Sequence, residues 1–145
     1  MTFRPGFTLM ELTIVLGMMA VFAGFASAIS VPTIRSAEFD RVRETIRNEL
    51  VAAQADTIGG TLDAAWGVAF TTGTVIRYRG ATYATRNTAF DRVTTFADDV
   101  TIGGTRDIPF NRPFGSVTST ATIILTNGTL YATTTVNTAG AVSVQ

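Results

Sequence analysis

The N-terminal stretch that decides the fold reads Arg4-Pro5-Gly6-Phe7-Thr8-Leu9-Met10-Glu11. It opens onto 23 residues, 12–34, that contain no charged side chain. A helix needs roughly 20 apolar residues to cross the hydrocarbon core of a bilayer, so we expect a transmembrane part at about residues 12–34. Glu11 lies at the edge of this run. Because an ionisable group on a membrane helix is costly, its presence predicts a functional role.

A partner for Glu11 follows from the residues before it. If the chain is cut between Gly6 and Phe7, Phe7 acquires a free α-amino group, which is cationic at neutral pH. That amine and Glu11 could then pair one copy of the helix with a neighbouring copy. Glu11 therefore predicts an intermolecular ion pair.

The motif Gly6-Phe7-Thr8-Leu9-x-Glu11, followed by an apolar helix, resembles the N-terminus of type IV pilins and of the pseudopilins of type II secretion systems. In that family a membrane peptidase cuts after the glycine and methylates the new N-terminal residue. The resemblance implies a prepilin leader at residues 1–6 and cleavage between Gly6 and Phe7. It also implies N-methylation of Phe7 and an assembly salt bridge through Glu11.

Two other interpretations of the N-terminus remain open. One is an ordinary signal-anchor helix, which gives the carboxylate of Glu11 no use. The other is a secretory signal peptide cleaved after the small residues 26–28. The apolar run is about twice as long as the usual core of such a peptide. Cleavage there would release a secreted domain instead of a filament subunit.

Composition narrows the chemistry that the chain can perform. The sequence has no cysteine and no histidine, which excludes a disulfide, a Cys or His metal site, a Ser/His/Asp triad and a Cys nucleophile. The formal net charge is +0, so no nucleic-acid partner is indicated by the overall charge. We expect no enzyme activity, no cofactor and no metal site.

A long N-terminal helix is predicted over residues 7–59. Its second half changes to an amphipathic pattern, with apolar residues at spacings of three and four: Phe39, Val42, Ile46, Leu50 and Ala53. Gly59 and Gly60 then predict its end, because glycine is favoured at a helix C-terminal cap. The stripe should be covered by a sheet.

Residues 60–145 read as a β-rich globular head. The candidate strands are 66–70, 75–79, 100–102, 107–110, 121–126, 129–136 and 141–144. Asn127-Gly128 predicts a type I′ hairpin turn between the fifth and sixth of these strands. Residues 81–99 are predicted to form a long connection without a strand. The whole chain is then α+β, with the long helix, apolar membrane half and amphipathic half, packed on one antiparallel sheet.

The order of elements in the head resembles the H-type minor pseudopilins. The matching features are Trp66-Gly67-Val68, the strand at residues 75–79, Ile108-Pro109-Phe110-Asn111 and Gly115. This resemblance implies a minor subunit in preference to a major one.

The head contains two sequence patterns that could bind a ligand, and each also has a purely structural explanation. Asp98 and Asp99, with Asp107 nearby, offer oxygen donors that suit calcium, but paired aspartates are also common turn formers. Basic and aromatic residues alternate in the middle segment and could contact DNA: Arg77, Tyr78, Arg79, Tyr83, Arg86 and Arg92. We expect these arginines to pair with acids or face water.

The resemblance implies a structural function, as a subunit of a type IV pilus or a type II secretion pseudopilus assembled by helix bundling. The implied partners are other pilin or pseudopilin subunits, a prepilin peptidase, an inner-membrane assembly platform and, before assembly, the lipid bilayer. The implied location is a single pass in the cytoplasmic membrane with the head outside the cytoplasm, followed by a surface or periplasmic filament. The alternative is a membrane-anchored or secreted binding domain that does not polymerise.

Overall fold

The computed structural model describes residues 7–96 and 100–145, except for the side chains of residues 25–35. The expected leader, residues 1–6, lies outside this described part. The chain divides into two compact units, Met1–Ala37 and Glu38–Gln145. One helix, α1 (Leu9–Ile58), contributes residues to both units.

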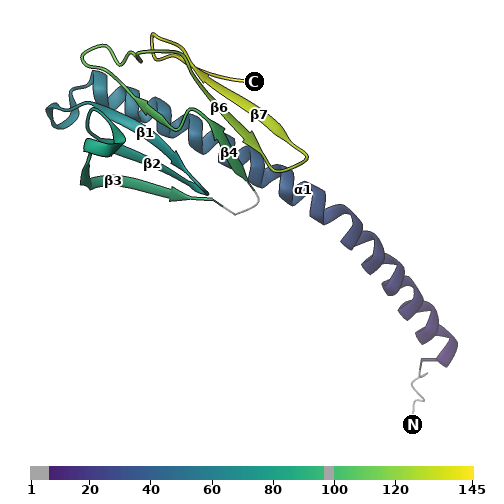
Figure 1. The fold of residues 1–145 in the computed structure, drawn as a ribbon. Helices are drawn as coiled ribbons and strands as arrows, with labels where there is room; N and C mark the ends of the chain where they lie inside the picture. The colour runs from purple at the N-terminus through teal and green to yellow at the C-terminus, as the bar shows by residue number, and fades with distance from the viewer. Residues whose placement is uncertain (1–6, 97–99) are drawn as a thin grey trace. The chain divides into compact units, whose positions relative to one another are not determined.

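The second unit carries two antiparallel sheets (Figure 1). The first sheet has the order β3-β2-β1-β5, and the second has the order β4-β6-β7-β8. The strands of the first sheet are β1 (Trp66–Thr71), β2 (Thr74–Arg79), β3 (Asn87–Thr95) and β5 (Asp107–Pro109). Those of the second are β4 (Thr101–Gly104), β6 (Ala121–Thr126), β7 (Tyr131–Val136) and β8 (Val142–Val144). Two short 3-10 turns, η1 (Thr61–Asp63) and η2 (Tyr83–Thr85), connect the elements.

The main core lies between the C-terminal part of α1 and both sheets. All five residues of the predicted helix stripe are buried, and they cluster with Trp66 of β1 and with Ile123 and Leu125 of β6. The predicted stripe is confirmed. The helix ends at Ile58, and Gly60 follows it with φ 64°. That left-handed conformation is one that glycine adopts without steric cost, which is why the chain can leave the helix there.

The prediction of a single sheet is wrong. β4 and β5 are close in sequence, yet β4 pairs with β6 and β5 pairs with β1. Gly104, with φ 86°, lies at the end of β4 and redirects the chain between the two sheets. Alternation of apolar and polar residues identifies strands but carries no information on which strands pair, so the sequence did not reveal this division.

The segment predicted as a long connection contains β3, a nine-residue edge strand. Most of its side chains are exposed, so it lacks the alternation that marks a half-buried strand. Pairing with β2 satisfies its backbone instead. The hairpin turn also differs from the prediction, because the loop holds four residues between Thr126 and Tyr131. There the side-chain oxygen of Asn127 accepts a hydrogen bond from the Leu130 N–H at 2.9 Å.

The expected membrane half of the helix is also corrected. Among the described residues, no helix is both long enough and apolar enough to cross a membrane. This finding contradicts the predicted transmembrane part and the single-pass location in the cytoplasmic membrane.

Candidate functional site

The N-terminal candidate site consists of Phe7 and Glu11 at the start of α1. Phe7 is 83% exposed and Glu11 is exposed. Gly6, the expected cleavage residue, lies outside the described part of the chain. Phe7 and Glu11 are separated by a little over one helical turn of sequence. The structure therefore leaves both groups accessible to another molecule.

Thr8 caps the helix that carries Glu11. The Thr8 carbonyl accepts from the Leu12 N–H at 3.2 Å, and its Oγ1 accepts from the Glu11 N–H at 3.3 Å. Thr8-x-x-Glu11 is the pattern of a capping box, in which a threonine and a glutamate satisfy the free N–H groups of a helix start. The sequence analysis did not identify this pattern, although its two residues and their spacing are present in the sequence. Glu11 also lies in the first turn, where the helix dipole favours a negative charge.

The segment around Glu11, residues 7–22, is mostly apolar, and its side chains are exposed in this unit. Its large apolar side chains are between 47% and 83% exposed. They are Phe7, Leu9, Met10, Leu12, Ile14, Val15, Leu16, Met18, Met19, Val21 and Phe22. Consecutive positions of a helix face in different directions, so this surface is apolar on every side. Contiguous exposed apolar surface of this kind marks an interaction site.

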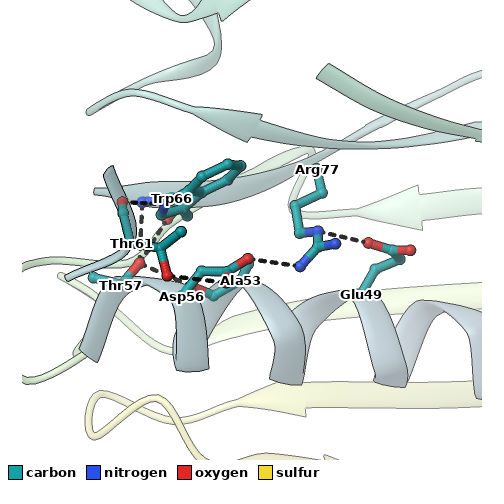
Figure 2. Close-up of polar contacts among 7 residues, drawn as sticks. All are labelled: Glu49, Ala53, Asp56, Thr57, Thr61, Trp66 and Arg77. Carbon is teal, nitrogen blue, oxygen red and sulfur yellow. Dashed lines mark hydrogen bonds and ion pairs between the residues drawn. The ribbon is translucent and has the colours of Figure 1, made fainter. Parts of the chain in front are cut away.

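A buried ion triad joins α1 to the first sheet in the second unit (Figure 2). The guanidinium of Arg77 on β2 lies 3.0 Å from Glu49 Oε2 and 2.7 Å from Asp56 Oδ2. Its side chain is only 8% exposed. Glu49 and Asp56 are seven residues apart, so both project from one helix face. The contact to Asp56 is an aligned hydrogen bond, whereas the contact to Glu49 is an ion pair without that alignment.

A second group of polar contacts fixes the chain just after α1. The hydroxyl of Thr57, which is buried, donates to the Ala53 carbonyl at 2.8 Å and accepts from the Trp66 N–H at 3.0 Å. The indole Nε1–H of Trp66 donates to the Thr61 carbonyl at 3.1 Å (Figure 2). These bonds tie the end of the helix to the start of β1. Together with the ion triad, they position the helix on the sheet.

The outer face of the first sheet carries a separate polar network. The Tyr78 hydroxyl donates to Asp107 Oδ1 at 2.6 Å, and the backbone N–H of Tyr83 donates to Asp107 Oδ2 at 3.2 Å. The ring of Tyr78 packs edge-on against that of Tyr83. Burial, and then the hydrogen bond to Asp107, raises the pKa of the Tyr78 phenol well above its ordinary value. Tyr78 therefore stays neutral under physiological conditions.

The arginines of residues 77–92 lie on different faces of the first sheet. Arg77 faces α1, whereas Arg86 stacks on the Tyr83 ring at 3.8 Å and pairs with Asp91 at 2.8 Å. The hydrogen bond to Asp91 raises the pKa of Arg86. Arg79 donates to the Leu62 carbonyl at 3.0 Å. The expected pairing with acids is thus confirmed for Arg77 and Arg86.

The calcium hypothesis gains no support from the described residues. Asp98 and Asp99 lie outside them, and Asp107 is occupied by the two tyrosines. Within residues 7–96 and 100–145, no group of acidic side chains is arranged to hold a metal ion.

A cavity of about 290 Å³ lies between the β1–β2 turn and β4, and Arg106 is the charged residue in its lining.

The chain was compared with family models, curated proteins and solved structures. No family model, no curated protein and no solved structure matches the chain.

Proposed function

We propose that the chain is a structural subunit of a type IV pilus or a type II secretion pseudopilus. In this proposal a prepilin peptidase cuts between Gly6 and Phe7 and methylates Phe7, and an assembly platform then adds the subunit to a filament of similar subunits. One observation carries the proposal: an exposed apolar helical segment, with Glu11 in its first turn, precedes a separately packed α+β unit.

The apolar segment favours assembly over a monomeric binding domain. Exposed apolar surface is stabilised when it is removed from water, by roughly 25 cal/mol per Å². A surface that is apolar on every side is covered best by several neighbouring helices. The ionic contacts of the second unit hold its own elements together. The proposal is therefore a structural function.

Processing is tested first, by mass spectrometry of the protein isolated from its own host. The expected N-terminus is Phe7 with a methylated amine. An intact Met1 terminus, or a terminus created after residue 28, would contradict the proposal.

Assembly is tested with variants of Glu11. Glu11→Gln keeps a side chain that suits a capping box but removes the charge, whereas Thr8→Val removes the capping hydroxyl and keeps the charge. If Glu11 pairs with the Phe7 amine of a neighbour, Glu11→Gln should lower the ratio of filament-borne to cell-retained subunit at least tenfold. Thr8→Val should lower it less, and Glu44→Gln, at an exposed position later in α1, should leave it unchanged. Equal ratios for Glu11→Gln and wild type would contradict the ion pair.

A further inference from the structure

One exposed face of the last two turns of α1 is apolar. Val51, Ala55 and Ile58 are spaced by four and three residues, so they share one helix face. All three are exposed, and Ile58 is 55% exposed. Leu62, just beyond the helix, is exposed as well. This face lies away from the stripe that forms the core.

The turn that carries Phe114 lies against the same part of α1. Phe114 is 79% exposed and precedes Gly115, whose backbone lies against Ile58: a Cβ at Gly115 would fall 2.9 Å from Ile58 Cγ1. The turn that presents Phe114 is closed by hydrogen bonds, from Asn111 N–H to the Ser116 carbonyl at 2.7 Å and from Gly115 N–H to the Asn111 carbonyl at 2.8 Å. We call Val51, Ala55, Ile58, Leu62 and Phe114 the apolar patch.

Leu62 is held in the patch by the rest of the second unit. Its φ of 56° lies in the left-handed region, which is unfavourable for a residue with a large side chain. The Leu62 carbonyl accepts from Arg79 at 3.0 Å, and the next residue, Asp63, pairs with Arg112 at 2.6 Å. The folded unit thus keeps an apolar side chain in contact with water.

The apolar segment of another copy fits this patch chemically. Residues 12–24 carry no charge, and their large apolar side chains are exposed. At Gly17 a Cβ would meet nothing within 4 Å, so the segment has a recess beside its bulky side chains. Small residues let helices approach closely, and the protruding Ile58 and Phe114 could fill such a recess. A pairing of patch with patch would leave the segment uncovered.

We propose that the apolar patch of one copy binds residues 12–24 of a neighbouring copy. The two surfaces are different, so the contact is heterologous, and it repeats without closing when the rotation between copies does not form a ring. It therefore suits an open-ended filament. This inference rests on the proposed function and identifies the surface of the second unit that receives the next subunit.

Cysteine cross-linking tests the contact, because the natural chain contains no cysteine. Filaments sheared from cells that make two variants, Ile58→Cys and Leu16→Cys, are oxidised and separated by mass. We expect a disulfide-linked dimer at least five times more abundant than with Val93→Cys and Leu16→Cys. Val93 is a matched control because it is apolar and 59% exposed, but it lies on β3. Equal yields, or no dimer with Ile58→Cys, would overturn the inference.

Substitution of the patch separates this inference from the proposed function. Ile58→Glu and Phe114→Ser should each lower the filament-borne fraction at least tenfold and leave the thermal midpoint within 2 °C of wild type. Val93→Glu should change neither. If the wild-type chain forms no filaments, the proposed function fails. If wild type, Ile58→Glu and Phe114→Ser all form filaments equally well, the docking inference alone fails.

Discussion

Arg77 and Asp56 form a hydrogen-bonded ion pair of 2.7 Å between the middle of β2 and the last turn of α1. Arg77 also lies directly opposite Arg92 across the β2–β3 pairing. Like charges in such positions are destabilising, and the carboxylates of Glu49 and Asp56 offset this by lying on the guanidinium of Arg77. A buried ionic contact of this kind restricts how the helix can be placed, because only one register brings all three groups together.

Arg77→Met should destabilise the second unit. Removing one partner of a fully buried ion pair costs roughly 3–5 kcal/mol. Here the loss should be smaller, about 2 kcal/mol, because Glu49 and Asp56 keep some contact with water. Chemical denaturation measures the change. Arg92→Met is the matched control on the neighbouring strand and should stay within about 0.5 kcal/mol of wild type. Equal losses of stability in Arg77→Met and Arg92→Met would mean that the ion triad does not stabilise the second unit.

Two buried threonines should respond in opposite ways to valine. Among the described residues, the Thr134 hydroxyl has no hydrogen-bond partner, although the side chain is fully buried. Thr134→Val should raise the free energy of unfolding by about 1 kcal/mol, because it removes an unsatisfied polar group at nearly constant shape. Thr57→Val should lower it by about 1–3 kcal/mol, because the Trp66 N–H loses its acceptor. Denaturant midpoints of both variants check this, and a loss with Thr134→Val would contradict it.

Gly67 should not tolerate a side chain. A Cβ there would collide with the ring of Tyr78 and lie 3.0 Å from the Ile108 carbonyl. Gly67→Ala should therefore cost about 1–3 kcal/mol, as overpacking of a core does. Gly103→Ala is the control, because its Cβ would make only ordinary contacts at 3.9 Å or more. Thermal unfolding of the two variants should differ by several degrees.

The raised pKa of Tyr78 predicts loss of stability at high pH. Free tyrosine ionises near pH 10, so above that pH the unfolded chain releases the Tyr78 proton while the folded chain retains it. The unfolded state then binds fewer protons, and stability falls as pH rises. Tyrosinate absorbance should show that one of the three tyrosines ionises only together with unfolding. If all three titrate while the fold is intact, the buried hydrogen bond to Asp107 is not maintained.

Residues 35–145 should fold alone as a monomer, because the core lies within the second unit. In this fragment Ile46→Asp should abolish folding, since Ile46 is fully buried and an unpaired charge in an apolar core costs several kcal/mol. Asn48→Asp, at an exposed position on the same helix, is the control and should fold normally. Circular dichroism and near-ultraviolet spectra distinguish the two. A normal spectrum for Ile46→Asp would place the stripe outside the core.

The sequence by itself determined the helix stripe, the end of α1 at Gly59-Gly60 and seven of the eight strands in the described part of the chain, because apolar periodicity and glycine preferences act locally. It did not identify β3, whose exposed side chains carry no alternation and whose backbone pairs only once β2 is in place. Only the tertiary structure decided that the strands divide into two sheets, that Arg77 reaches Glu49 and Asp56, and that Gly115 lies against Ile58. Each of these contacts joins residues far apart in the chain, and their free energy depends on packing geometry that no local pattern encodes.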